Sequence, residues 1–115
     1  MTLVEKHCQA CEGGVAPLTI EEANKYLLKV VDWEIDATGK TMSCIFSFKN
    51  YYHTMAFVNA IAFMAHFENH HPDMTVSYNS CKVLYTTHAI GGLSENDFIC
   101  AAKVNKLFSE SKGTR

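Results

Sequence analysis

The spacing of apolar residues divides the chain into helical and extended segments. A first helical stripe follows residues 19–22, which have the Thr-x-x-Glu spacing of a capping box, and consists of Ala23, Tyr26, Leu27 and Val30. In such a box the threonine hydroxyl accepts a hydrogen bond from a backbone N–H in the first helical turn. The pattern predicts a helix that begins directly after Thr19.

Alternation of apolar and polar residues predicts two β-hairpins. The expected strands, in chain order, are 33–35, 42–48, 75–78 and 82–88. Turn-forming residues at 36–40 and 79–80 separate the members of each pair. The Gly91–Gly92 pair is expected to end the last strand, directly after His88.

Two further helices are expected. The segment from about His53 to Asn69 carries a helical stripe but is apolar over more than one face, which is typical of a heavily buried helix. It should end near His70, because the ring of Pro72 restricts His71 to extended geometry. A third helix follows the capping sequence 94–97, with its stripe at Phe98, Ala101, Ala102, Asn105 and Phe108.

The expected order of elements is α-β-β-α-β-β-α, without an internal repeat or a linker. This order predicts an α+β domain of two layers, in which three helices pack on one face of a four-stranded antiparallel sheet. We assign residues 1–115 to a single domain and treat residues 1–17 as an irregular N-terminal lead-in. Because such a domain leaves a sheet face or edge uncovered, we expect self-association.

Composition argues against several classes of partner. The chain has 115 residues, of which 48% are apolar, and a formal net charge of −2. Its basic residues are scattered, so the electrostatic footprint expected of a protein that binds nucleic acid or an anionic membrane is missing. The most apolar segment, 55–65, is interrupted by Asn59 and is too short to span a bilayer. With no signal-peptide pattern, we expect a cytoplasmic protein.

The chain contains five cysteines, an odd number that would leave one thiol unpaired in an oxidising compartment. Reduced thiols in the cytosol are the simpler interpretation. Cys8 and Cys11 form a single Cys-x-x-Cys sequence, which lacks the second ligand pair of a zinc ribbon. Glu12 stands where attachment of a c-type haem requires His. The sequence favours an exposed, mobile arm here over a metal or redox site.

Histidines carry the candidate chemistry. His70 and His71 directly precede Pro72, and the dipeptide Thr87–His88 lies on the last expected strand. Imidazoles change charge near neutral pH, so grouped histidines can both donate and accept protons. His70 also lies at the expected C-terminus of a helix, where the macrodipole favours the imidazolium form. The cluster therefore indicates acid–base chemistry on a small molecule.

Other roles for these residues are open at this level. His66 and His70 are four residues apart on one expected helix, so they should share a face and could bind a metal with His71 or His88. However, Phe67 stands where the zinc-protease motif requires Glu. The pattern thus does not favour a native metal.

Three further polar residues have simpler interpretations. His7 and His53 are isolated along the sequence and are assigned structural or surface roles. Asp97 lies three residues after Ser94, a spacing that favours helix capping over catalysis.

The combined spacing resembles a known family, the pterin-4a-carbinolamine dehydratases. The residues that carry the resemblance are His66, His70, His71, Pro72, Tyr78, His88 and Asp97, with Gly92-Leu93-Ser94 as context. The likeness extends from the first helix through Trp33 and residues 46–50 to the last helix. Many members carry Glu where this chain has His66 and Asp where it has Asn69.

This resemblance implies removal of water from 4a-hydroxytetrahydropterin to give the quinonoid dihydropterin. The reaction recycles the cofactor of aromatic amino acid hydroxylases, so such a hydroxylase is an expected functional partner. The family uses no metal and no organic cofactor. The resemblance also implies that His70, His71 and His88 form the active-site trio.

Our hypothesis divides these roles among the residues. His71 and His88 flank the reacting carbon and transfer protons, while His70 holds the pterin ring. The residues expected to assist in binding the pterin are His66, Asn69, Pro72 and Thr87. The chain is expected to assemble as a homodimer or homotetramer.

Two other functions remain open. Animal members of the resembled family also act as dimerisation cofactors of a homeodomain transcription factor, so an interaction module is the first alternative. A zinc-dependent hydrolase built on the histidines is the second.

Overall fold

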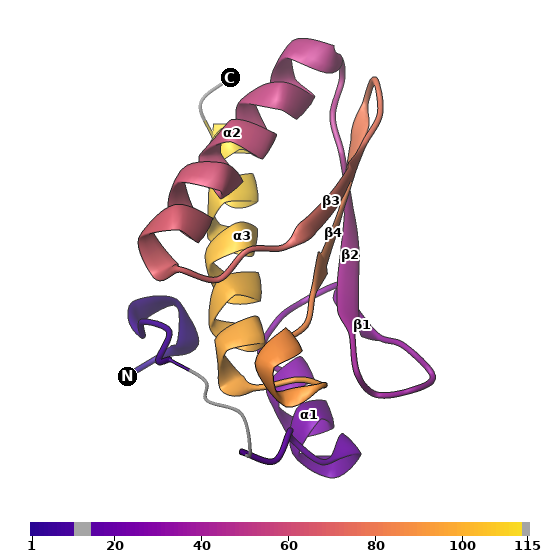
Figure 1. Cartoon of the computed structure of the whole chain (residues 1–115). Coiled ribbons are helices and arrows are strands. Elements are labelled where there is room, and N and C mark those ends of the chain that lie inside the picture. The colour runs from indigo at the N-terminus through magenta and orange to yellow at the C-terminus, as the bar shows by residue number, and fades with distance from the viewer. Residues whose placement is uncertain (11–14, 114–115) are drawn as a thin grey trace.

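The computed structural model describes residues 1–10 and 15–113, and its order of α-helices and strands matches the prediction (Figure 1). The elements are η1 (Leu3–Glu5), α1 (Ile20–Leu27), β1 (Glu34–Ile35), β2 (Met42–Ser47), α2 (Tyr51–Glu68), β3 (Asp73–Val76), β4 (Ser80–Tyr85), η2 (His88–Ile90) and α3 (Glu95–Gly113), where η marks a short 3₁₀-helix. The α+β fold is confirmed. Cys11, the second cysteine of the Cys-x-x-Cys sequence, lies outside the described residues.

The four strands form one antiparallel sheet in the order β1-β2-β4-β3. Both predicted hairpins are present, β1 with β2 and β3 with β4. They join along β2 and β4, where Met42 pairs with Tyr85 and Ser47 pairs with Ser80. Because α2 lies between the hairpins in sequence, the central pairing of the sheet depends on contacts between distant segments.

One face of the sheet carries the core. The buried positions of β2 and β4 alternate along each strand, as a half-buried sheet requires, and are Met42, Cys44, Phe46, Cys81, Val83 and Tyr85. Helices α2 and α3 lie on this side of the sheet (Figure 1). The rings of Phe57 and Phe108 both contact Phe46, and each has its centroid 5.0 Å from the centroid of the Phe46 ring. The opposite face is open, and Ile45 is 66% exposed there.

The capping box predicted at Thr19 is present, and α2 begins at Tyr51, earlier than expected, after a cap at Asn50 that was not predicted. At α1 the Thr19 hydroxyl accepts from the Glu22 N–H at 3.2 Å, while the Glu22 carboxylate accepts from the Thr19 N–H at 2.9 Å. At α2 the side chain of Asn50 accepts from the His53 N–H at 2.9 Å. Each cap satisfies a backbone donor that the first helical turn leaves without a partner.

The second hairpin differs from its predicted position. β3 begins at Asp73 and ends at Val76, and the Ser77 N–H donates to the Ser80 carbonyl, so the turn comes earlier than expected. β4 ends at Tyr85, and His88 is the first residue of η2 rather than a strand residue. The cause is a tight loop in which Thr87 bridges Gly92 and Gly91 adopts φ +69°.

The end of α2 also corrects one expectation. The helix ends at Glu68, and Asn69 takes the left-handed conformation with φ 54° and ψ 42°. The His70 N–H then donates to the Ala65 carbonyl, which is the closing bond of a Schellman motif. His66 and His70 therefore do not share a helix face, because the chain reverses between them.

Residues 1–9 of the predicted N-terminal lead-in are held against α2 and α3 rather than forming an irregular arm. η1 buries Leu3, which is only 7% exposed, and the Lys6 ammonium donates to Glu95 at 2.8 Å. Residues 7–9 are held by further hydrogen bonds to α2 and α3. Across the described ranges, none of the helices has the length and apolar character needed to cross a bilayer.

The α2 cap gives a test of this description. Replacing Asn50 with Ala should lower the free energy of unfolding by about 1 kcal/mol, because the His53 N–H loses its acceptor. Urea denaturation followed by circular dichroism measures this change. Asn50→Asp is the matched control, since its carboxylate can accept the same bond and should retain most of the stability. Equal losses in both variants would contradict a capping role.

Candidate active site

Three chain segments meet at the carboxylate of Asp97, which is fully buried in the first turn of α3. The Nε2–H of His70 donates to Oδ1 of Asp97 at 2.6 Å. The Thr87 hydroxyl donates to Oδ2 at 2.8 Å, and the Ser94 N–H donates to the same oxygen at 3.0 Å. The end of α2, the exit of β4 and the start of α3 are thereby tied to one side chain.

The local backbone explains why His70 arrives there. The left-handed Asn69 turns the chain away from the α2 axis, and β3 begins only three residues after His70. β3 pairs antiparallel with β4, with Asp73 opposite Leu84. The segment between α2 and β3 therefore runs past the end of β4, where Thr87 follows.

The hydrogen bonds to Asp97 determine which residue is the donor in the neighbouring bond between Thr87 and Ser94. Because Thr87 gives its single hydroxyl proton to Asp97, the 2.8 Å contact between Thr87 and Ser94 must run from the Ser94 hydroxyl to the Thr87 oxygen. Each carboxylate oxygen of Asp97 accepts at least one bond, which offsets the cost of burying its charge. The capping role predicted for Asp97 is confirmed, but its bond to His70 was not predicted.

The pKa of His70 is controlled by two opposing effects. Burial lowers the pKa, but the hydrogen bond to Asp97 and the negative charge of Asp97 outweigh burial, so the net pKa lies above its ordinary value. The contact with Asp97 therefore stabilises the imidazolium form of His70 relative to an unperturbed imidazole. Since Nε2 is bound to Asp97, Nδ1 is the nitrogen left for another partner.

Tyr85 is a second residue that contacts the His70 side chain. Its ring stacks on the imidazole, with centroids 5.5 Å apart and an angle of 7° between the planes. The Tyr85 hydroxyl is buried and has no geometrically aligned hydrogen-bond partner among the described residues. Burial, followed by its neighbour Cys100, raises the pKa of this hydroxyl. The alternation of β4 indicates that Tyr85 is buried, but the sequence contains no signal that it meets His70.

His71 and His88 are both exposed, and each is the chain neighbour of a residue bound to Asp97. Consecutive Cα atoms are about 3.8 Å apart. The backbones of His71 and His88 therefore flank the bonded group of His70, Asp97 and Thr87. No contact joins the two imidazoles to each other in the described part of the chain.

The remaining histidines and candidate residues have separate positions. His66 lies exposed in the last turn of α2, Asn69 is the exposed left-handed cap, and Pro72 is half-buried before β3. His7 contacts the Glu68 carboxylate at 2.8 Å, in agreement with a structural role.

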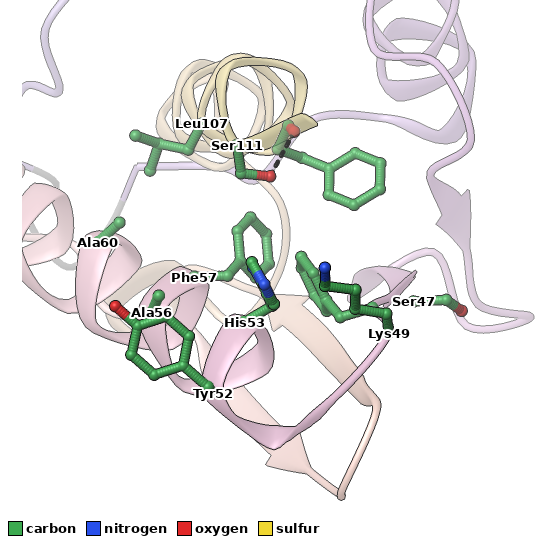
Figure 2. Close-up of a pocket in the computed structure, with 11 residues that line it drawn as sticks. Ser47, Lys49, Tyr52, His53, Ala56, Phe57, Ala60, Leu107 and Ser111 are labelled. Atoms are coloured by element: carbon green, nitrogen blue, oxygen red, sulfur yellow. Dashed lines mark hydrogen bonds between the residues drawn. The ribbon is translucent and has the colours of Figure 1, made fainter. Parts of the chain in front are cut away.

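His53 lies at the other end of α2, beside a cavity of about 520 Å³ between α2 and the C-terminal half of α3. Figure 2 shows His53 and Lys49 next to this cavity, with Leu107 and Ser111 on the α3 side. About 20 Å of helix separates His53 from the end of α2 near His70. This cavity is therefore distinct from the surroundings of Asp97.

A metal centre finds little support in the geometry. Within residues 1–10 and 15–113, no three His, Cys, Asp or Glu side chains come together as a metal-binding group. His70 commits Nε2 to Asp97, and His66 is separated from it by the reversal at Asn69.

Comparison with known proteins identifies the family. The family model for pterin 4 alpha carbinolamine dehydratase matches residues 16–107. The chain belongs to this family. It is 61% identical to a relative from Nitrosomonas europaea over 92% of this chain and 93% of the relative, and 58% identical to one from Nitrosospira multiformis over 92% of each. Both relatives are named as dehydratases of this type.

A solved structure agrees with the assignment. The transcriptional coactivator/pterin dehydratase from Brucella melitensis superposes with a TM-score of 0.76 at 28% identity, covering 79% of this chain and 97% of that one. Membership in the pterin-4a-carbinolamine dehydratases makes the protein a hydro-lyase, as the sequence resemblance implied.

The contact between His70 and Asp97 gives a test. Asp97→Asn should lower the pKa of His70 below that of the wild type, because the favourable charge is lost while burial remains. NMR titration of the His70 ring measures this shift. Since the folded-state pKa is raised, the pair contributes fully to stability below about pH 6.5 and loses its contribution as the pH rises through that raised pKa. The difference in unfolding free energy between wild type and Asp97→Asn should decrease as the pH rises from about 6.5 through the raised pKa of His70.

The matched control is Glu110→Gln, which removes one exposed carboxylate at the far end of α3. This variant should leave the His70 titration unchanged. A His70 pKa that is the same in wild type and Asp97→Asn would show that the contact does not set its protonation.

Proposed function

We propose that the protein dehydrates a 4a-hydroxytetrahydropterin to the quinonoid dihydropterin by acid–base catalysis at His71 and His88. Family membership supports the reaction class. The bonds of His70 and Thr87 to Asp97 support the site, because they draw together the two segments that carry His71 and His88. This convergence is the observation on which the proposal rests.

The reaction needs one proton donor and one proton acceptor. One imidazolium gives its proton to the hydroxyl oxygen of the substrate, the carbon–oxygen bond breaks, and water leaves. The lone pair of the neighbouring ring nitrogen forms the new carbon–nitrogen double bond, and the proton of that nitrogen passes to the second imidazole. One histidine loses a proton and the other gains one, so the step balances with water as the only by-product.

His71 and His88 suit the transfer of protons because both are exposed and can reach a bound molecule. His70 suits a different role. It is held by Asp97 and by the Tyr85 ring, so it can orient the pterin through Nδ1 without moving. Its raised pKa favours the imidazolium form, and we propose that this positive charge helps to stabilise the leaving oxygen.

The expected pterin-binding residues divide into two groups. His66, Asn69 and Pro72 lie around the end of α2 and are proposed to contact the ring or its side chain. Thr87 acts differently, because its hydroxyl is already engaged with Asp97 and Ser94. We assign Thr87 a positioning role, in which it fixes the carboxylate that holds His70.

The physiological setting follows from the product. Quinonoid dihydropterin arises in the cofactor cycle of aromatic amino acid hydroxylases, so the enzyme would serve such a hydroxylase in the cytoplasm. The four described cysteines are free thiols, which suits a reducing compartment.

His71→Ala and His88→Ala should each lower kcat/KM for carbinolamine dehydration by about 10²- to 10⁴-fold, because each removes one proton-transfer group. Stopped-flow absorbance of the dihydropterin product measures the rate. His53→Ala is the matched control, since His53 lies near the opposite end of α2, and its rate should equal that of the wild type. A variant of His71 or His88 that keeps nearly the full rate would remove that residue from the mechanism.

We further propose that the outward face of α2 binds a second copy of the chain. This helix is apolar over more than one face, and Tyr52, Phe63 and Phe67 are 76%, 77% and 72% exposed. A helix of this kind is expected to be covered on both sides. The open strand edges of β1 and β3 offer additional contacts for a dimer or tetramer.

Phe63→Glu should reduce the assembly to a monomer of 12.9 kDa, because it introduces a charge into the proposed apolar contact. Light scattering coupled to size-exclusion chromatography measures the mass. Leu28→Glu places the same charge on an apolar residue that is 88% exposed in the segment after α1, and should leave the assembly intact. A wild-type protein that elutes as a monomer would contradict the proposal.

An interaction role is the second candidate function. The Brucella melitensis structure carries the name of a transcriptional coactivator as well as that of a dehydratase. The exposed aromatic residues of α2 would suit such a role, with a partner helix in place of the second copy. Dehydration by the purified chain in the absence of a partner distinguishes catalysis from a purely accessory function.

A further inference from the structure

The thiols of Cys8 and Cys100 lie next to each other although the two residues are 92 positions apart. Their sulfur atoms are 3.5 Å apart, with Cys8 on the N-terminal arm and Cys100 in α3. From this pair we propose a redox modification site, in which a peroxide converts the two thiols into a disulfide that fastens the arm to α3. A disulfide has an S–S distance of about 2.05 Å, so the sulfurs need to approach by roughly 1.5 Å.

The backbone on both sides of Cys8 is already held in place. Its N–H donates to Glu68 at 2.8 Å, and Gln9 makes two bonds with the side chain of Asn96, at 3.0 and 2.6 Å. Asn96 precedes Cys100 by one helical turn. The arm is therefore oriented toward Cys100 before any covalent bond forms, and the encounter of the two sulfurs requires little ordering.

The two thiols differ in exposure and in pKa, and these differences give them separate roles. Cys8 is half-buried and accessible to a small oxidant, whereas Cys100 is fully buried. The hydrogen bond between the two thiols lowers the pKa of Cys100 and raises the pKa of Cys8, so loss of one proton leaves an S–H···S⁻ pair with the negative charge on Cys100. Transfer of the remaining proton from Cys8 to Cys100 along the 3.5 Å contact moves the negative charge to Cys8, which is the sulfur that a small oxidant can reach.

The chemistry balances with hydrogen peroxide as the oxidant. The Cys8 thiolate attacks one peroxide oxygen, the O–O bond breaks, and hydroxide leaves to become water, which gives a sulfenic acid at Cys8. The Cys100 thiolate then attacks the Cys8 sulfur, the S–O bond breaks, and a second water is released. Two thiols are oxidised, one peroxide is reduced to two waters, and a reducing thiol reverses the bond.

The other described thiols provide a contrast. Burial raises the pKa of Cys44 to about 11 and also raises the pKa of Cys81. Both are buried, and neither has another sulfur within bonding reach among the described residues. Because a disulfide needs a second sulfur nearby and an accessible thiol, its formation should be selective for Cys8 and Cys100.

The tryptic map of the chain allows a direct test. Cleavage places Cys8 and Cys11 in peptide 7–25, while Cys100 is the single cysteine of peptide 83–103. The reduced full-length protein is treated with hydrogen peroxide, free thiols are alkylated with N-ethylmaleimide, and the digest is analysed by mass spectrometry without reduction. We expect peptide 7–25 linked to peptide 83–103, in the wild type and in Cys11→Ser, and loss of the link after dithiothreitol.

Two outcomes would overturn the proposal. One is closure of peptide 7–25 on itself through Cys8 and Cys11 without a link to 83–103. The other is complete alkylation of both Cys8 and Cys100 in Cys11→Ser after peroxide treatment. Cys44→Ser is the control for a thiol outside the pair and should form the link to the same extent as the wild type.

Thermal unfolding provides a second readout that does not depend on digestion. Oxidation of Cys11→Ser should raise its Tm by about 5 °C or more, since the bond closes a very long loop in the unfolded chain. The double variant Cys8→Ser/Cys11→Ser keeps the buried Cys100 and should show no such rise. A Tm that does not increase in Cys11→Ser, or that increases equally in the double variant, contradicts the proposed bond.

Discussion

The buried carboxylate of Asp97 is the interaction on which the arrangement of this site depends. A charge that is fully excluded from water is tolerated only when its oxygens are bonded, and here the donors come from three separate segments. Because His70 and Thr87 must both donate to this carboxylate, the end of α2 and the residues after β4 are held close together. His70 is at once a partner that stabilises the carboxylate and a residue whose protonation the carboxylate controls. Stability and chemistry are linked through one side chain.

The layout of the sheet makes this convergence possible. β3 lies at the edge and β4 lies inside, so the connection from α2 to β3 must pass the end of β4 before the strand pair begins. α3 returns across the same sheet face and brings Asp97 to that point with its first turn. The loop from Thr87 to Gly92 is short and closed by its own hydrogen bonds, which keeps Thr87 and His88 close to the strand.

Much of this arrangement could be predicted from residue patterns. Alternation along the strands, the capping box at Thr19 and the proline after His71 are local signals, and they led to the correct order of elements. The ends of elements were harder, because the left-handed Asn69 and the loop closed at Gly91 depend on backbone conformations that residue identity suggests only weakly. The capping role of Asp97 could be predicted because it lies three residues after Ser94 in the sequence. Its contact with His70 was not, because the register that brings the two segments together is set by tertiary packing.

The N-terminal arm has a consequence for where the folded unit begins. Glu68 is 7% exposed, and its carboxylate accepts from the Cys8 N–H and contacts His7, each at 2.8 Å, while Lys103 lies 3.6 Å away. The family match starts only at residue 16. A fragment that begins at that boundary would keep every strand and α-helix. It would lose the contacts of Glu68 with His7 and Cys8, so that among the described residues only Lys103, 3.6 Å away, would balance the charge of Glu68. Homology and electrostatics thus delimit this domain differently, and the electrostatic boundary is the earlier one.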